Sequence, residues 1–368
     1  MTMRPTRVSM IGTLACAMML GTISAAPAQT QLKVMVFPGL SNVPIFAAQH
    51  KNLFAKHGLA IELLNTPNSD VLRNGLAKGD HQIAHAAVDN AVAMVELAKA
   101  DVAIVTGGDN GFNRIFVQPE INAYAELRGK TVVVDAPNTA YALLLYKVLK
   151  DSGLNRGDYV VKPVGGTTAR LDAMTKDKAN AAGVLNPPYT FRAKEAGLKD
   201  MGAAAKAIGA YQAGGAFVMR DWAKANSDTL VRYISAYVEG CRWALDPANK
   251  VEAIALIADR LKLTPDVAAQ SYAVATDPPD NIAKDAKFNM EGFKTCSSCA
   301  PRSKDSGAEI RRHRKNMSIC HFTIGRWRAS DSERNRLWPN EFPHCRQQRS
   351  PFSHRTSAGL KQSSTFTT

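Results

Sequence analysis

Short apolar strands alternate with helical segments along the first third of the chain, and this alternation limits the folds open to it. Strand patterns lie at residues 32–37, 60–64, 81–86 and 102–105, with helical spacing of apolar residues between them. A helix between two strands favours parallel pairing, because a parallel connection must cross one face of the sheet. The pattern therefore predicts an α/β fold whose mostly parallel sheet carries helices on both faces.

The same alternation starts again near residue 122, which predicts a second, smaller α/β lobe over residues 122–205. Residues 206–294 supply a strand and three helices that we expect to return to the first lobe, formed otherwise by residues 29–121. The chain would then cross between the lobes twice, which allows a hinge. This division rests on strands at 127–135, 159–164, 181–185 and 213–219 and on helices at 139–152, 168–174, 228–245, 251–261 and 265–272.

The N-terminal residues have the pattern of an export signal. Two arginines precede an apolar run over residues 8–23, and Ala26-Pro27-Ala28 offers the small residues that a signal peptidase reads. We expect residues 1–28 to be removed by cleavage after Ala28, and the remaining chain to act in the periplasm. A lipoprotein signal ending at Cys16 is the alternative, and it fits less well because little apolar sequence precedes that cysteine.

The positive charge of the chain is concentrated at its C-terminal end. Residues 295–368 hold 14 Lys and Arg against 5 Asp and Glu, a formal +9 of the chain's +14. The rest of the chain is close to balanced, so its charge gives no reason to expect a nucleic acid or a membrane surface as partner. Most of the cysteines also lie in this end segment. Only Cys241 lies between the leader and the end segment, and we expect it to be a core residue.

Residues 295–368 lack apolar periodicity and are rich in Arg and Ser, a composition that cannot bury a core. We therefore expect the segment to be disordered. Its cysteine and histidine pairs also allow a zinc module. A frameshift near Lys294 explains the composition better, because back-translated codons read in a shifted frame continue the preceding helix with apolar residues. The shift would lie either in the genome or in its sequencing.

Three phrases in the chain resemble those of one family of exported binding proteins. They are the helix at residues 46–59, the strand entry Leu127-Arg128-Gly129-Lys130-Thr131-Val132, and the passage from Leu171 to the turn at Pro188. In this order they resemble the periplasmic substrate-binding proteins of ABC importers of the sulfonate, taurine, nitrate and thiamine-pyrimidine type. The resemblance covers residues 32–293, although Asn52 stands where the family usually has glycine. It implies a two-lobed, type II periplasmic binding protein with its ligand in the cleft between the lobes.

Candidate ligand-binding residues follow the predicted strands of both lobes. In open α/β sheets a ligand lies beyond the carboxyl ends of the strands, where helix N-termini present unpaired N–H groups. Polar side chains there can bind a ligand, although Ser, Thr and Asn also serve as helix caps at such positions. The candidates are Phe37, Ser41, Asn42, Asp89, Asn90, Asp109 and Asn110 in the first lobe and Asn138, Thr139, Thr167, Thr168 and Asn186 in the second. Stacking on a ring-shaped ligand is open to Phe37, Phe112, Tyr141 and Tyr189, with core packing as their alternative role.

These features predict a binding protein and not an enzyme. The chain has no nucleophile elbow, phosphate-binding loop or zinc-protease motif, and we expect no cofactor and no metal. The resemblance implies capture of a small anionic organic solute, such as a sulfonate, nitrate or carboxylate, or of a pyrimidine. It also implies the permease and ATPase of the importer as partners, and we expect a monomer. A sensor ectodomain and a thiamine-pyrimidine biosynthetic enzyme of the same fold are the alternatives.

Overall fold

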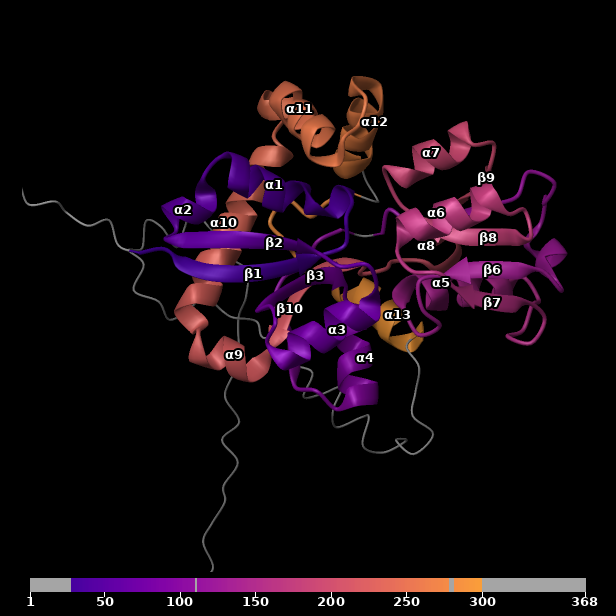
Figure 1. The fold of residues 1–368 in the computed structure, drawn as a ribbon, viewed down its shortest axis with the longest axis horizontal. Coiled ribbons are helices and arrows are strands. Elements are labelled where there is room, and N and C mark those ends of the chain that lie inside the picture. The colour runs from indigo at the N-terminus through magenta and orange to yellow at the C-terminus, as the bar shows by residue number, and fades with distance from the viewer. Residues whose placement is uncertain (1–27, 110, 278–280, 300–368) are drawn as a thin grey trace, which may run out of the picture. The chain divides into compact units, whose positions relative to one another are not determined.

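The computed structural model describes residues 28–109, 111–277 and 281–299 and contains two five-stranded sheets (Figure 1). The strands of the first sheet are β1 (Thr30–Val36), β2 (Leu59–Asn65), β3 (Ile83–Ala87), β4 (Val102–Ile104) and β10 (Gly214–Met219). They lie in the order β2-β1-β3-β10-β4. β1 pairs in parallel with β2 and β3, and β10 runs antiparallel between β3 and β4. β10 lies in the strand predicted at residues 213–219 and pairs within the first sheet.

Helices cover both faces of the first sheet, as the alternation of strand and helix patterns along the sequence predicts. Leu32, Val34 and Val36 of β1 pack on one face, while Met35 and Phe37 point to the other. The first face carries α1 (Val43–His50), α2 (Leu53–Lys56) and α10 (Ser227–Ala244), and the second carries α3 (Ser69–Lys78) and α4 (Asp89–Ala98). α11 (Lys250–Leu261) packs on α1 and on α12 (Pro265–Thr276), and the short α9 (Arg220–Ala225) follows β10.

The first helix is interrupted, in contrast to the single helix predicted to end at Gly58. α1 ends at His50, and α2 begins after Asn52, whose φ of 54° lies in the left-handed region. A left-handed residue breaks a right-handed helix, and glycine and asparagine tolerate that conformation best. This break gives a physical reason why the position is usually glycine in the family that the sequence resembles.

The second sheet repeats the strand order of the first with other strands. It comprises β5 (Arg114–Val117), β6 (Thr131–Val134), β7 (Val160–Pro163), β8 (Asn180–Leu185) and β9 (Lys199–Ala203) in the order β7-β6-β8-β5-β9. β6 is parallel to β7 and β8, and β5 is antiparallel to β8 and β9. Because β5 precedes residue 122, the predicted boundary between residues 121 and 122 lies too late. The chain crosses back between β9 and β10.

The helices of the second lobe also cover two faces. Ile115 and Val117 of β5 pack into a cluster with α5 (Ala140–Asp151) and α8 (Ala204–Ile208). Phe116 points to the opposite face, where α6 (Thr167–Lys176) and α7 (Tyr189–Glu195) lie. The predicted α/β architecture with two lobes is therefore confirmed. Short 3-10 turns at Leu40–Asn42, Tyr124–Leu127 and Pro247–Asn249 complete the described elements.

The last described helix, α13 (Met290–Cys299), contacts both α4 and α5. Gly292 allows this helix to approach the chain before β10, because a Cβ atom there would overlap the backbone N of Gln212. The predicted start of disorder at Thr295 is wrong for residues 295–299, which continue the helix. Residues 300–368, the remainder of the segment assigned to a frameshift, lie outside the described residues.

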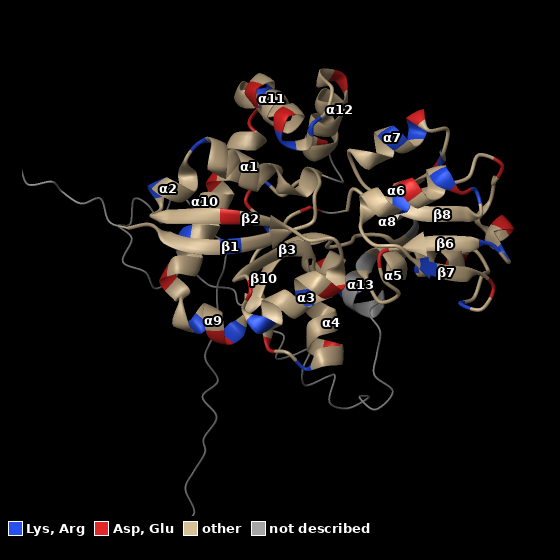
Figure 2. Cartoon of the chain, in the orientation of Figure 1, with Lys and Arg blue, Asp and Glu red and all other residues tan. Residues whose placement is uncertain are grey.

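Positive and negative side chains are interspersed over the helices and loops of both lobes (Figure 2). This distribution agrees with the near balance of charge that the sequence has outside its C-terminal end. Within the described part of the chain, no helix has the length and apolar character needed to cross a bilayer. Cys241 is buried in α10 with a free thiol, as predicted for a core residue.

Candidate functional site

A small cavity of about 40 Å³ lies where loops of the two lobes meet. The second lobe supplies Tyr141, at the start of α5, and Asn186, which follows β8. All other lining residues belong to the first lobe, from the loop after β1, the end of β3, the loop after β4, the start of β10 and the middle of α10. A space of this size holds few atoms, so a larger solute requires the lobes to separate.

Asp109 is the one carboxylate among the residues that line this cavity. Its Oδ2 accepts a hydrogen bond from Ser41 Oγ at 2.9 Å, and its Oδ1 accepts one from the backbone N of Gly111 at 3.2 Å. Burial raises the pKa of this carboxyl group, while the Ser41 hydroxyl and nearby backbone N–H groups oppose that shift. None of the ion pairs among the described residues includes Asp109. The carboxylate therefore lacks a cationic partner there.

Gly214 makes room for the Asp109 side chain. A Cβ atom at position 214 would overlap Asp109 Oδ2, so any other residue would displace the carboxylate or the strand. Gly214 also begins β10, which pairs with the end of β3 beside the cavity. The start of β10 thus fixes the place of the acidic group in the first lobe.

Tyr141 and Asn186 form a joined pair on the side of the second lobe. Asn186 Nδ2 donates to Tyr141 Oη at 3.2 Å, and the guanidinium of Arg170 lies 5.1 Å from the Tyr141 ring centre. Arg170 is fully buried and does not line the cavity. It donates to Val184 O, Gly165 O and Thr167 Oγ1 at 2.8–2.9 Å. These hydrogen bonds of Arg170 therefore hold together the loops next to Tyr141.

Two hydrogen bonds join the lobes beside the cavity. Ser69 Oγ of the first lobe donates to Asp135 Oδ2 of the second at 2.8 Å, and the backbone N of Gly166 donates to Pro67 O at 3.3 Å. Asp135 also accepts from its neighbour's backbone N and from the Thr139 hydroxyl. Opening of the cavity by separation of the lobes would break these two interlobe bonds.

Asp89, at the start of α4, is a buried carboxylate with no hydrogen-bond partner on either oxygen among the described residues. Burial raises its pKa well above the ordinary value, and the charge of Asp135 raises it further. The charge of Arg73 and the backbone N–H groups at the start of α4 act in the opposite direction. Asp89 does not line the cavity, but its charge acts on Tyr141, which does. In its ionised form this carboxylate adds negative potential next to Tyr141.

His85 lines the cavity as a neutral side chain. Its Nε2 lies 2.8 Å from Tyr233 Oη, and its ring centre lies 4.8 Å from that of Tyr237. Burial lowers the pKa of His85 to about 3, so the imidazole carries no positive charge near neutral pH. Across residues 28–109, 111–277 and 281–299, no three His, Cys, Asp or Glu side chains are grouped so as to hold a metal ion.

The predicted ligand-binding residues are distributed unevenly around the cavity. Asp89, Asn90 and Thr139 are buried but do not line it, and Thr167 accepts a hydrogen bond from Arg170. Asn138 and Thr168 are exposed, and Asn110 lies outside the described residues. Ligand binding by any of these residues remains a prediction. Those that line the cavity are Phe37, Ser41, Asn42, Asp109 and Asn186.

The predicted helix caps at Ser41 and Asn42 are not formed. Asn42 Nδ2 donates to Phe37 O at 2.7 Å, and Ser41 bonds to Asp109, so neither side chain caps α1. Both side chains instead hold the loop after β1 against the cavity. Their hydrogen bonds give these residues a positioning role in the candidate site.

Several lining residues were not predicted from the sequence. The sequence pattern indicates only a strand at Gly214 and Gly215. It indicates a helix at Tyr237, whose position favours a place in the core. His85 falls within the strand predicted at residues 81–86. No local signal identifies them, because their place at the cavity depends on the return of the chain to the first lobe. The first-lobe lining residues outside the loops expected at residues 37–42, 87–90 and 107–110 are His85, Ala86, Gly214, Gly215 and Tyr237.

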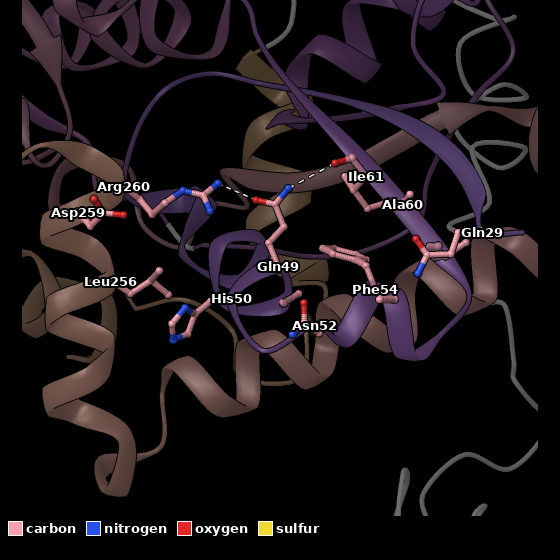
Figure 3. Close-up of a pocket in the computed structure, with 13 residues that line it drawn as sticks. Gln29, Gln49, His50, Asn52, Phe54, Ala60, Ile61, Leu256, Asp259 and Arg260 are labelled. Carbon is pink, nitrogen blue, oxygen red and sulfur yellow. Dashed lines mark hydrogen bonds between the residues drawn. The ribbon is translucent and has the colours of Figure 1, made fainter. Parts of the chain in front are cut away.

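A larger groove of about 500 Å³ lies on the first lobe alone, between α1, α2, β2 and α11. Figure 3 shows Gln49 between Arg260 and Ile61 in this groove. Arg260 Nη2 donates to Gln49 Oε1 at 2.6 Å, and Gln49 Nε2 lies 3.5 Å from Ile61 O. The groove is open to solvent and its Gln49 amide is already paired. We therefore take the interlobe cavity as the candidate ligand site.

Comparisons with known proteins agree with this fold. A protein of Brachyspira hyodysenteriae that carries the name of an ABC transporter periplasmic binding protein is 25% identical over 239 residues, which is 60% of this chain and 67% of that protein. The alkanesulfonate-binding protein SsuA from Xanthomonas axonopodis pv. citri, bound to MOPS, matches with a TM-score of 0.62 and 18% identity, over 75% of this chain and 96% of that one. The periplasmic nitrate-binding protein NrtA from Synechocystis matches with a TM-score of 0.61 and 14% identity, over 72% and 76%.

These two structural matches have low sequence identity, so they show the fold and leave the solute open. The resemblance to periplasmic binding proteins that the sequence phrases indicated is confirmed by the matches. A family model described as the NMT1-like family matches residues 25–258. Because this match covers well over half of the chain, the chain belongs to the NMT1-like family and has the fold of the substrate-binding proteins of ABC importers.

Proposed function

We propose that this chain is the solute-capturing subunit of an ABC importer, and that it binds a small organic solute in the cavity between its lobes. The observation that carries the proposal is this cavity, which is lined by the first lobe and closed by Tyr141 and Asn186 of the second. In this arrangement a solute would bind the first lobe and then hold the second lobe in place. The permease and ATPase of the importer are the partners that such a subunit serves.

The proposal assigns no catalytic step to the chain. The polar groups at the cavity are engaged in holding loops, as Ser41 and Asn42 are, and His85 is neutral and in contact with Tyr233. The Ser41 hydroxyl does donate to the Asp109 carboxylate, but this hydrogen bond holds the loop after β1, and the proposal assigns it no covalent step. A biosynthetic enzyme of the same fold is therefore the less favoured function. A sensor ectodomain would use the same cavity and would differ in its partner.

Export is part of the proposal, with cleavage after Ala28 and action in the periplasm. Residues 1–27 of the predicted leader lie outside the described residues, so the support is the sequence pattern of two arginines, an apolar run and small residues. Mass spectrometry of the mature N-terminus tests this. A chain that begins at Gln29 is expected, and a chain that retains Met1 or carries lipid on Cys16 would contradict it.

A frameshift near Lys294 is also proposed. The support is the contrast between the residues up to Lys294 and the basic segment that follows, which has no apolar pattern. Resequencing of the gene around the Lys294 codon tests it: one restored reading frame should continue α13 with apolar residues. A confirmed printed frame, with stoichiometric zinc binding by the end segment, would contradict the proposal.

Solute capture is tested by a thermal-shift screen of the mature chain against sulfonates, nitrate, carboxylates, amines and pyrimidines. A solute that binds only the native state raises the melting temperature. An Ala87→Phe variant places a ring in the cavity and should lose the shift. Ala269→Phe, at an exposed position of α12, is the matched control and should keep it. No shift with any class, or an equal shift in both variants, would contradict capture in this cavity.

A further inference from the structure

The cavity presents hydrogen-bond acceptors and aromatic faces but no cation. Asp109 is its one carboxylate, its histidine is neutral, and no Lys or Arg belongs to its lining. Phe37, Tyr141 and Tyr237 contribute aromatic rings. Ring faces carry negative charge density and attract cations within about 6 Å. The carboxylate and the rings therefore both favour a positively charged group on the solute.

Unpaired acceptors surround the cavity as well. Both oxygens of Asp89, together with Oδ1 of Asn90 and Oδ1 of Asn186, are buried and have no hydrogen-bond partner among the described residues. Asn186 lines the cavity, and the charge of Asp89 acts on Tyr141 in its wall. Buried acceptors without donors are costly, so a bound group that donates an N–H to Asn186 Oδ1, the one of these acceptors on a lining residue, would offset part of that cost.

The one buried cation near the cavity is already engaged. Arg170 donates to three oxygens of its own lobe, and its charge interacts with Asp135. It therefore balances Asp135, while Asp89 has the charge of Arg73, which also pairs with Asp70, and Asp109 forms no ion pair among the described residues. The positive end of α4 does not change this balance, because Asp89 occupies the first position of that helix.

We propose that the cavity selects a solute with an ammonium or amidinium group, placed against Asp109 and next to the rings of Phe37, Tyr141 and Tyr237. This inference rests on the proposed function of solute capture. It departs from the anionic solute that the family resemblance implies, because a sulfonate or nitrate at this place would meet Asp109 with no lining cation to balance it. An ammonium group supplies a positive charge for Asp109 and N–H donors for Asn186 Oδ1.

Isothermal titration of the mature chain with two matched probes, benzylammonium and benzenesulfonate, tests the proposal. Both probes carry one ring and one charge of opposite sign, so their affinity ratio reports the preference of the cavity. Benzylammonium should bind more tightly. Asp109→Asn keeps the side-chain oxygen for Ser41 and removes the charge, and it should weaken benzylammonium binding by at least about tenfold. Asp151→Asn removes an exposed carboxylate that pairs with Lys147 and should leave both affinities unchanged.

If Asp109→Asn fails to fold, the ratio of the affinities of benzylammonium and benzenesulfonate for the unmodified chain still tests the proposal. Tighter binding of benzenesulfonate, equal binding of both probes, or no binding of benzylammonium at millimolar concentration would overturn the proposal. So would an Asp109→Asn variant that folds and binds benzylammonium as tightly as the unmodified chain. Should a sulfonate or nitrate shift the melting temperature in the screen above while benzylammonium fails, solute capture stands and only the charge preference is wrong.

Discussion

The two lobes share one strand order but contribute unequally to the cavity between them. In each sheet the fourth strand in order is the one that follows a crossing of the chain between the lobes. This strand is β10 in the first lobe and β5 in the second, and it runs antiparallel to both of its neighbours. The first lobe nevertheless supplies every lining residue except Tyr141 and Asn186. Similar topology therefore does not mean a similar role, because the role depends on which loops reach the cavity and which side chains they carry.

The unequal contribution assigns the lobes different tasks. The first lobe holds the acidic group, fixed by Ser41, Gly111 and the space at Gly214. The second lobe brings a hydroxyl and an amide, and it is joined to the first by the Ser69–Asp135 hydrogen bond. We infer that the first lobe determines which solute binds, and that the second determines how firmly the bound solute is enclosed.

Gly214→Ala tests the task of the first lobe and should have the largest effect. The added Cβ overlaps Asp109 Oδ2, so the carboxylate or β10 must move. Overpacking of this kind costs about 1–3 kcal/mol of stability, and binding of the screened solute should fall with it. Thermal unfolding and titration measure the two effects. Gly157→Ala, where a Cβ atom meets open space, is the control and should change stability by less than about 0.5 kcal/mol.

Asp89→Asn should raise the melting temperature of the solute-free chain near neutral pH. It removes a buried carboxyl group whose ionised form has no hydrogen-bond partner among the described residues, a gain of about 1 kcal/mol, or about 1–2 °C for a chain of this size. Because folding raises the pKa of Asp89, the charged form opposes folding above that raised pKa, and protonation relieves this as the pH falls. The advantage of the variant should therefore shrink on acidification toward the ordinary carboxyl value of 3.8.

His85 gives a pH dependence of opposite sign. Its pKa falls from 6.5 to about 3 on folding, so the neutral form stabilises the fold above pH 6.5, and that stability is lost as the pH drops toward 3. His85 is present in both the unmodified chain and the Asp89→Asn variant, so its effect cancels in their difference. Melting curves of the two proteins over this pH range separate the groups. A difference that grows on acidification would contradict the assignment to Asp89.

Tyr141→Phe tests the task of the second lobe with a smaller expected effect. The change removes the hydroxyl that accepts from Asn186 Nδ2 and keeps the ring in the cavity wall. We expect a loss of binding free energy of about 1 kcal/mol, seen mainly as faster dissociation. Stopped-flow or surface-plasmon measurements give both rate constants. A loss as large as that from Gly214→Ala would contradict the unequal roles of the lobes.

Ser69→Ala should have the smallest effect, because it removes one hydrogen bond between the lobes and none of the lining groups. The expected cost is about 0.5 kcal/mol, expressed as easier separation of the lobes. Small-angle scattering of the solute-free variant should give a slightly larger radius of gyration than the unmodified chain. With solute bound, the two proteins should agree. A persistent difference with solute bound would assign Ser69 a direct part in binding.

The arrangement of the sheets could be predicted from the sequence to a large extent. Alternating apolar residues identify the parallel strands, since a strand such as β1 buries Leu32, Val34 and Val36 on one face and leaves Gln31 and Lys33 exposed on the other. β5 was missed because four residues, Arg114–Val117, are too short a run to show a period. The break at Asn52 was missed because the apolar spacing continues through it. Local patterns thus identify elements better than they identify their ends or interruptions.

The candidate site could be predicted only in part, for a physical reason. Ser41 and Asp109 follow strands whose carboxyl ends meet at one edge, so their place follows from the sheet. Tyr237 and Gly214 reach the cavity only because the chain returns to the first lobe after completing the second. The charge of the site also depends on which carboxylates stay unpaired, and that follows from tertiary contacts such as those of Arg170.

A crystal structure of the mature chain with the solute from the thermal-shift screen tests the central claim most directly. The account predicts solute density between Asp109 of the first lobe and Tyr141 and Asn186 of the second, with most contacts from the first lobe. A solute bound in the groove beside Gln49 and Arg260 would contradict it, because that groove involves the first lobe alone. A solute held mainly by the second lobe would contradict it equally.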